Sequence, residues 1–265
     1  MHGINPQLPQ RRSAAAFIRL RDPTFTRLIR TAPCPPGNTA HQPRRKLPIT
    51  PDILLRIHRL LDFTRPLHVT LWSAFLIAFY SFLRKSNLVP PSDTAYDARI
   101  HLSRGSVGYN TTGLIIRITW SKTIQFGERV LHIPILAIPG SALCPVSAYK
   151  QMVDMLPAPS EAPLFLAPSS TGRLHPLTYQ SFVRHLRSLL SSTGLDPNSY
   201  SGHSFRRGGA SFAFQSGADP EAIKAQGDWR SQAYLLYMES SFGRRLRTAS
   251  CIRAAIKSGQ VDLTL

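Results

Sequence analysis

The sequence predicts a mainly α-helical protein with a small antiparallel β-sheet, an α+β fold. Two observations predict it. Apolar residues recur at helical spacing between residues 50 and 90 and again after residue 143, whereas they alternate with other residues only in short segments between these two regions. The chain has 265 residues, of which 43% are hydrophobic, so it can bury a sizeable core and is not a disordered protein.

The first helix is expected to begin after Thr50, a favoured N-cap residue, because Pro51 suits the first helical position and Asp52 favours the helix N-terminus. Apolar residues then follow at helical spacing. A second, strongly apolar helix is expected over 67–83, continuing into the segment LRKSN at 83–87. It is shorter than the ~20 residues that span a membrane, so we expect it to lie in the protein core.

The middle of the chain predicts the sheet. Alternating residues at 114–120 and 130–135 indicate two strands, and a preceding strand is expected over Ile100–Tyr109. The segment SKTIQFGER at 121–129 would form the turn between the two later strands. Helix-sized segments follow, separated by Gly, Asp or Pro, at 144–156, 177–192, 202–217, 219–226 and 231–242.

The charge balance indicates a polyanionic partner. The chain carries 32 basic and 14 acidic residues, a net charge of +18, and 26 of the basic residues are arginine. Nucleic acid is the first candidate and an anionic membrane surface the second. The few, scattered carboxylates argue against a two-metal nuclease, and three distant cysteines argue against a zinc site or a disulfide framework. We therefore expect no metal and no cofactor, in a reducing compartment, and we expect neither a membrane nor a small-molecule substrate as partner.

Residues 1–46 differ from the rest of the chain. They carry nine basic residues and one acid, with prolines crowded toward the end, and a short helix is expected near Ala14–Arg21. This segment is interpreted as a basic, Pro-rich arm or linker, or as the remnant of a larger N-terminal region. Residues 47–245 are expected to form the main domain and 246–265 a C-terminal tail.

Several residues could carry chemistry, although each is ordinary when it is taken alone. In GHSFRRGG, at 202–209, His203 and Arg206 share one helix face and could meet an oxygen-rich anion, but a helix start with solvated arginines fits as well. Arg84 follows the apolar helix, where a charge must reach solvent or a partner. Lys122 lies in a predicted turn. Trp229 precedes a segment with two tyrosines, Tyr234 and Tyr237.

Taken in order, these residues resemble the catalytic domain of the tyrosine recombinases, the phage integrase-type family. That family joins an Arg, a Lys on a β-hairpin, His-x-x-Arg, a His or Trp and a nucleophilic Tyr in this sequence order. The resemblance covers about Lys46–Arg245, and segments such as SFLRKSNLVP, WSKTIQFGER and GDWRSQAYLLY look most like recombinases of Crypton or DIRS-type mobile elements. The matching residues are Arg84, Lys122, His203, Arg206, Trp229 and Tyr237.

The resemblance implies a metal-independent DNA strand transferase that serves integration of a mobile element. Tyr237 would form a covalent 3′-phosphotyrosyl link, with His203 assisting proton removal and Lys122 protonating the leaving 5′ oxygen. The two arginines would clamp the phosphate, and Trp229 would offer an N–H and packing surface. The partner would be double-stranded DNA, with self-association into a synaptic tetramer. Further DNA contacts are expected from Arg44, Arg45, Lys46, Lys85, Arg207 and Arg230.

Two departures from the family pattern keep alternatives open. Asn87 stands where an acid usually supports the first Arg, and the interval from Trp229 to the tyrosine is one residue short, which leaves Tyr234 as a second candidate nucleophile. A decayed or domesticated DNA-binding protein and a type IB topoisomerase-like relaxase are the competing functions. Residues 1–46 are too short for the family's N-terminal DNA clamp, so weak DNA affinity is expected. The resemblance implies a nuclear protein in a eukaryote, and otherwise a cytoplasmic, nucleoid-associated one.

Overall fold

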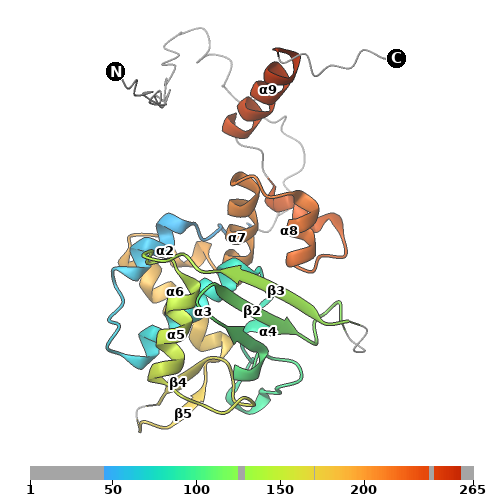
Figure 1. Ribbon diagram of the computed structural model, residues 1–265. Helices are drawn as coiled ribbons and strands as arrows, with labels where there is room; N and C mark the ends of the chain where they lie inside the picture. The colour runs from blue at the N-terminus through green and yellow to red at the C-terminus, as the bar shows by residue number, and fades with distance from the viewer. Residues whose placement is uncertain (1–44, 125–128, 170, 239–241, 258–265) are drawn as a thin grey trace, which may run out of the picture. The chain divides into compact units, whose positions relative to one another are not determined.

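A computed structural model describes residues 45–124, 129–169, 171–238 and 242–257 (Figure 1). The chain divides into two units, 1–44 and 45–265. The first unit, with the expected helix near Ala14–Arg21 and with Arg44, lies outside the described residues. The α-helices of the second unit are α2 Pro51–His58, α3 Pro66–Ser81, α4 Lys85–Leu88, α5 Pro145–Met155, α6 Tyr179–Ser192, α7 His203–Gln215, α8 Pro220–Gln226 and α9 Phe242–Lys257.

Helix α2 begins where the sequence predicts. The Thr50 hydroxyl accepts a hydrogen bond from the Ile53 amide at 3.3 Å, which satisfies one of the amides that a helix start leaves open. Pro51 occupies the first turn, and Asp52 pairs with Arg56 at 2.9 Å. The helix is therefore fixed by local interactions.

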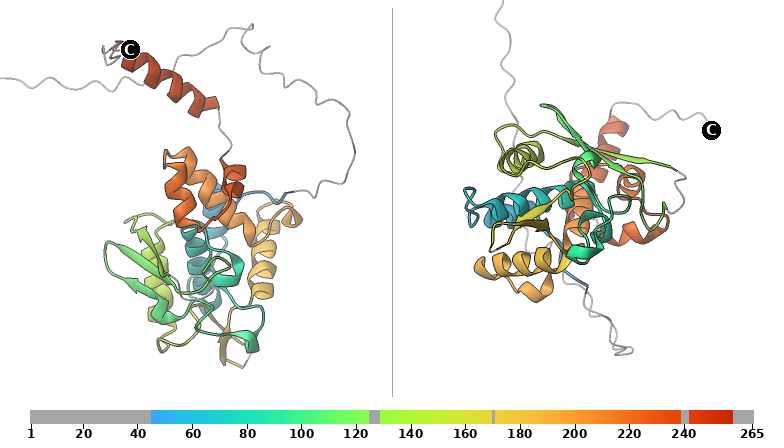
Figure 2. Two further views of the ribbon diagram at one scale, coloured as in Figure 1. Left: turned by 90° about the vertical axis from the view of Figure 1, so that its right-hand side faces the viewer. Right: turned by 90° about the horizontal axis from the view of Figure 1, so that it is seen from below.

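Helix α3 is the centre of the core, as expected. It lies between the layer formed by α5 with the sheet and the layer formed by α6 (Figure 2). Phe75 packs against Phe182 of α6 and Phe205 of α7, with ring centroids 5.2 and 5.1 Å apart. In the described part of the chain, no helix is long and apolar enough to cross a membrane.

The end of α3 differs from the expectation. The helix stops at Ser81, because Phe82 adopts a left-handed conformation with φ 51°, and the segment LRKSN does not continue it. Arg84 instead lies in extended backbone as the N-cap residue of the short helix α4. The short connection between α3 and α4 therefore sets the position of the Arg84 side chain.

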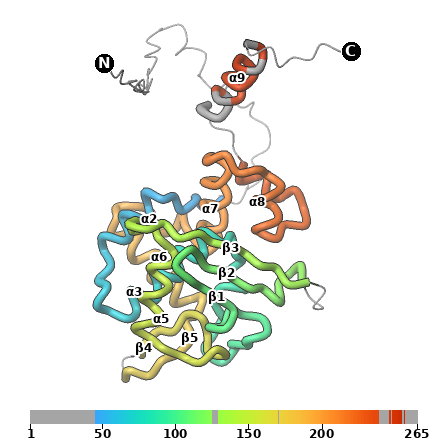
Figure 3. The backbone as a smooth tube through the Cα atoms, viewed as in Figure 1, coloured from blue at the N-terminus to red at the C-terminus, as the bar shows by residue number. Residues whose placement is uncertain are grey.

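The main sheet has the order β1-β2-β3, with all pairs antiparallel (Figure 3). Its strands are β1 Val107–Tyr109, β2 Gly113–Ile118 and β3 Leu131–Leu136, and Ile116 lies opposite Ile133. The expected strand over Ile100–Tyr109 is too long. Residues Arg104–Ser106 form a 3-10 turn, since the amides of Arg104 and Gly105 donate to a loop near Ser160 rather than to a strand.

The C-terminal half is helical as predicted in α5 to α8, and it differs from the prediction in three places. Strands β4 Leu166–Pro168 and β5 Leu174–Pro176 form a hairpin that the sequence did not predict, because each strand is only three residues long and contains proline. The segment expected as a helix over 231–242 contains a 3-10 helix, η4, at Gln232–Tyr237. Helix α9 runs across the boundary expected between residues 245 and 246.

Two glycines let α7 pack unusually close to its neighbours. A β-carbon on Gly208 would overlap the Ile49 carbonyl oxygen, and one on Gly209 would overlap the Phe79 carbonyl oxygen. Glycine is needed at both positions because neighbouring backbone approaches them too closely for any side chain.

Residues 45–49, which we name the entry segment, run along the start of α7. The amides of Leu47 and Ile49 donate to the carbonyls of Ser199 and Ser204 at 2.8 and 2.9 Å. The Arg207 guanidinium donates to the Lys46 carbonyl at 2.7 Å. The entry segment is thus hydrogen-bonded to α7 and to the residues that precede it.

Candidate functional site

The predicted site residues come from five separate segments of the chain. His203 and Arg206 lie in the first turn of α7, Trp229 follows α8, and Tyr237 ends η4. Arg84 lies at the α3–α4 junction, and Lys122 lies in the turn 121–124 after β2. Their contacts show which of them meet.

His203 and Tyr237 are hydrogen-bonded. The distance between His203 Nε2 and the Tyr237 hydroxyl oxygen is 2.7 Å. Partial burial, reinforced by the positive charges of Arg206, Arg207 and Arg84, lowers the pKa of His203 below its ordinary value. The imidazole is therefore neutral at pH 7 and can accept a proton from the tyrosine.

The other tyrosine, Tyr234, has a different environment. It is buried, and its hydroxyl donates to Glu221 Oε1 at 2.6 Å. This hydrogen bond to the carboxylate raises the pKa of Tyr234, so its phenolate is disfavoured. Of the two candidates, Tyr237 is the one bonded to an imidazole, whereas Tyr234 is bonded to a carboxylate.

Arg206 is a buried cation held between backbone and an aromatic ring. Its guanidinium donates to the carbonyls of Phe82 and Gly227, the second at 2.7 Å, and lies 3.7 Å from the ring centre of Trp229. Burial and the charge of Arg84 lower the pKa of Arg206 to about 9, which still leaves it protonated at pH 7. Trp229 thus packs on Arg206 by a cation–π contact.

Arg84 is bonded to an acid that the sequence analysis did not single out. Its Nη1 donates to Asp228 Oδ2 at 3.3 Å, and its Nη2 donates to the Asp228 carbonyl at 2.8 Å. Asp228 is buried, and its carboxylate also accepts from Arg129. An acid beside Trp229, in a chain with so few acids, was the available signal.

Asp228 has an uncommon backbone conformation. Its φ is 53°, and it ends α8: the Asp228 amide donates to Ala225 and the Trp229 amide to Lys224, each at 3.1 Å. This pair of hydrogen bonds is the Schellman motif, in which the left-handed position is most often glycine. Here an aspartate occupies it, and the turn directs its carboxylate toward Arg84.

The turn 121–124 is attached to the same carboxylate. Ser121 Oγ donates to Asp228 Oδ2 at 2.8 Å, and the Thr123 hydroxyl donates to that oxygen as well. Lys122 lies between these two residues and is exposed. The structure therefore brings the Lys122 turn to the Arg84–Asp228 pair through the neighbours of the lysine.

Asn87, in the place of the family's usual acid, makes a different contact. It is buried, and its side-chain amide donates to the Trp120 carbonyl at 2.7 Å. It thus ties α4 to the end of β2, while the carboxylate beside Arg84 comes from Asp228.

The expected DNA-contact residues that the structure describes share an exposed or half-buried position, and several make internal contacts. Lys46 donates to the Asn198 carbonyl at 2.6 Å, and Lys85 lies 4.3 Å from the ring centre of Tyr179. Arg230 donates to the Thr123 carbonyl, and Arg45 is exposed. Their roles toward DNA stay predictions.

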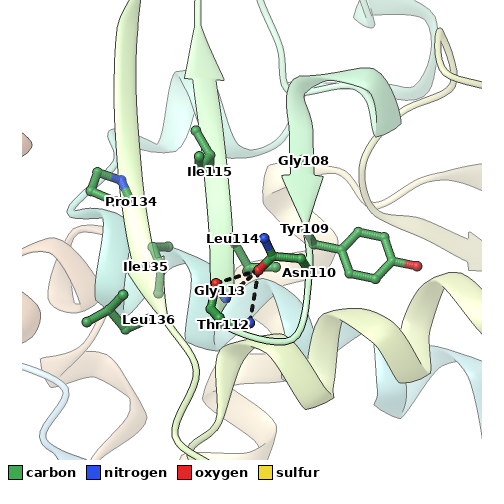
Figure 4. Close-up of a pocket in the computed structure, with 10 residues that line it drawn as sticks. All are labelled: Gly108, Tyr109, Asn110, Thr112, Gly113, Leu114, Ile115, Pro134, Ile135 and Leu136. Carbon is green, nitrogen blue, oxygen red and sulfur yellow. Dashed lines mark hydrogen bonds between the residues drawn. The ribbon is translucent and has the colours of Figure 1, made fainter.

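Four pockets among the described residues are lined by none of the predicted catalytic residues. One of about 380 Å³ opens on the sheet, at the hairpin that the Asn110 side chain closes by accepting from the amides of Thr112 and Gly113 (Figure 4). Its lining is mostly apolar strand residues. Within the described residues, no group of three or more His, Cys, Asp or Glu could hold a metal ion.

Comparisons with known proteins find the fold but no related sequence. No protein-family model matches the chain, and no curated protein does. A structure of the XerH site-specific recombinase bound to palindromic difH substrate matches with a TM-score of 0.55 and 13% identity, over 80% of this chain and 55% of that one. A lambda integrase dimer bound to a COC′ core site matches with a TM-score of 0.52 and 15% identity, over 77% of this chain and 62% of that one.

The Tn1549 transposon integrase in complex with a circular intermediate DNA matches with a TM-score of 0.51 and 14% identity, over 81% of this chain and 68% of that one. The chain spans about half the length of the XerH structures. At such identities the likeness concerns the fold. This chain therefore has the fold of tyrosine recombinase catalytic domains, as the sequence analysis expected.

Proposed function

We propose that this protein cuts and rejoins DNA through a covalent 3′-phosphotyrosyl intermediate on Tyr237. The observation that carries the proposal is the 2.7 Å contact between His203 Nε2 and the Tyr237 hydroxyl, beside Arg84 and Arg206. A phenol bonded to a neutral base, next to two cations, is the arrangement that a tyrosine needs in order to attack a phosphodiester.

The cleavage step follows from these positions. The Tyr237 oxygen attacks phosphorus while His203 Nε2 takes the phenolic proton, and the bond to the 5′ oxygen breaks. Arg84 and Arg206 stabilise the negative charge that develops on the nonbridging oxygens. Lys122 supplies the proton for the leaving 5′ oxygen. Rejoining is the reverse step, in which a 5′ hydroxyl displaces Tyr237.

Arg84 and Arg206 contribute in different ways. Two of the five N–H donors of Arg206 are engaged by the Phe82 and Gly227 carbonyls, so its position is fixed before DNA binds. Arg84 is more accessible, with 23% of its side chain exposed, and Asp228 restrains it from one side. We infer that Arg84 makes the first contact with the phosphate and that Arg206 adds a preorganised charge behind it.

The finer assignment is site-specific recombination that integrates a mobile element, with double-stranded DNA as substrate and a synaptic tetramer as the working assembly. It is supported by the Crypton-like and DIRS-like segments of the sequence. The matched Tn1549 integrase, which the comparison describes as a transposon protein bound to circular intermediate DNA, also supports it.

The test is a trapping experiment with the full chain and a pool of nicked, partly randomised DNA duplexes. Denaturant-resistant protein–DNA adducts are isolated from the wild type, Tyr237→Phe and Tyr234→Phe. We expect adducts from the wild type and from Tyr234→Phe but none from Tyr237→Phe, and sequencing of the trapped DNA identifies the preferred site.

The competing functions predict different results. A DNA-binding protein without catalysis would bind the pool but form no adduct with any of the three proteins. A type IB topoisomerase-like relaxase would form adducts with little sequence preference and would relax supercoiled plasmid. Adducts that persist in Tyr237→Phe would contradict the assignment of the nucleophile.

A further inference from the structure

The carboxylate of Asp228 joins two parts of the site that lie more than 100 residues from it in the sequence. Its Oδ2 accepts from Ser121 Oγ at 2.8 Å, from the Thr123 hydroxyl and from Arg84 Nη1 at 3.3 Å. Ser121 and Thr123 are the two residues that flank Lys122. A single buried oxygen therefore restrains the turn on both sides of the lysine.

The backbone at Asp228 indicates that the side chain has a specific purpose. The residue ends α8 in a left-handed conformation, where a glycine would avoid the steric cost that a β-carbon brings. A buried carboxylate also needs partners in order to be tolerated, and here Ser121, Thr123, Arg84 and Arg129 supply them. Both features place a hydrogen-bonded carboxylate at the base of the Lys122 turn.

We infer that Asp228 is a positioning residue for Lys122: it holds the turn 121–124 so that the lysine reaches the 5′ oxygen of the cleaved strand. The inference rests on the proposed function, in which Lys122 is the proton donor. It adds to that function a residue outside the set of six that the sequence resemblance identifies.

The chemistry of the step gives the inference a specific signature. The bond from Tyr237 to phosphorus forms, the bond from phosphorus to the 5′ oxygen breaks, and the Lys122 ammonium gives its proton to that oxygen. When sulfur replaces the bridging 5′ oxygen, a thiolate leaves with the electron pair and needs no proton, because a thiol is a far stronger acid than an alcohol. A misplaced Lys122 is therefore harmful for the oxygen substrate alone.

The first test does not depend on catalysis. Asp228→Asn keeps the shape of the side chain and tolerates the left-handed backbone, but it removes the charge. Trypsin cleavage after Lys122 is compared with cleavage after Arg173, an exposed residue between β4 and β5. We expect cleavage at Lys122 to accelerate by about tenfold, which corresponds to about 1.4 kcal/mol in the free energy of opening, with Arg173 unchanged. An unchanged rate at Lys122, or equal acceleration at both sites, would overturn the inference.

The second test uses the DNA site recovered by the trapping experiment, made with either oxygen or sulfur at the bridging 5′ position. We expect Asp228→Asn to slow adduct formation by about 10- to 100-fold on the oxygen substrate and to approach the wild-type rate on the sulfur substrate. The double variant Ser121→Ala/Thr123→Val, which leaves the Arg84 ion pair in place, should show the same pattern.

The outcomes separate the inference from the proposed function. If Asp228→Asn slows adduct formation equally on both substrates, the inference is overturned. The Asp228 carboxylate would then act by positioning Arg84 instead of Lys122. If the wild-type chain forms no adduct with either DNA, the proposed function fails, and the trypsin comparison still decides whether Asp228 fixes the turn.

Discussion

At the scale of single residues, the site consists of groups whose ionisation is set by their neighbours. His203 is bonded to Tyr237 and lies near three guanidiniums, and partial burial disfavours its charged form further. The imidazole therefore stays unprotonated at neutral pH, as the proposed role of a base requires. The same cations that would bind a phosphate also keep the base ready.

This arrangement predicts how adduct formation depends on pH. The pKa of His203 is lowered from 6.5, so we expect the rate to fall as pH decreases, with a midpoint below 6.5. The unfolded chain binds this proton more readily, so the free energy of unfolding also decreases as pH falls below 6.5. In His203→Gln we expect adduct formation to be slower by about 100-fold or more. We also expect its rate to lose the decrease with a midpoint below pH 6.5. A rate that rises on acidification would contradict the role of His203 as base.

The residues of the site differ in how far the sequence predicts them. Arg84, His203, Arg206 and Tyr237 were singled out because their order along the chain resembles that of the tyrosine recombinases, and their catalytic roles stay predictions. Asp228 was not identified, because its partners Ser121 and Thr123 are 107 and 105 residues away, and the local signal, an acid next to Trp229, does not indicate those partners.

At the scale of elements, local signals predicted what local interactions build. The start of α2 was predictable because Thr50 caps it, and Thr178 caps α6 in the same way. The end of α3 was not, because Phe82 leaves the helix in a left-handed conformation that its sequence does not favour. Its carbonyl accepts from Arg206, so a tertiary contact supports that end.

The close packing of α7 gives a prediction about stability. Gly208→Ala would place a methyl group into the Ile49 carbonyl, so we expect the free energy of unfolding to decrease by about 1–3 kcal/mol. Denaturation in urea measures it. Gly108→Ala in β1 is the control, because a β-carbon there meets nothing within 4 Å. Equal stability of the two variants would show that α7 can move away from the entry segment with little loss of folding free energy.

At the scale of the whole molecule, the dominant feature is the positive net charge. A net charge of +18 in 265 residues favours binding to a polyanion over long range, and the excess of arginine suits phosphate contacts. The charge does not define the site, which depends on a few buried groups. Affinity for DNA and cleavage of DNA should therefore respond differently to substitution.

Salt dependence measures the contribution of charge. If about six phosphates are neutralised, the logarithm of the DNA association constant should fall against the logarithm of salt concentration with a slope of about −5. The double variant Arg45→Gln/Lys46→Gln should make the slope shallower. Arg99→Gln, which removes an exposed arginine paired with Asp97 at 2.8 Å, is the matched control and should leave it unchanged. A slope near zero for the wild type would contradict an electrostatic interface.

The hydrogen bonds of the entry segment have a mechanical consequence. Residues 45–49 are bonded to the beginning of α7 and to the loop before it, within a few residues of His203 and Arg206. A force pulling on the chain ahead of Arg45 would be resisted first by these hydrogen bonds. Tension applied at that end would therefore act on α7, which carries His203 and Arg206, before it reached the core around α3.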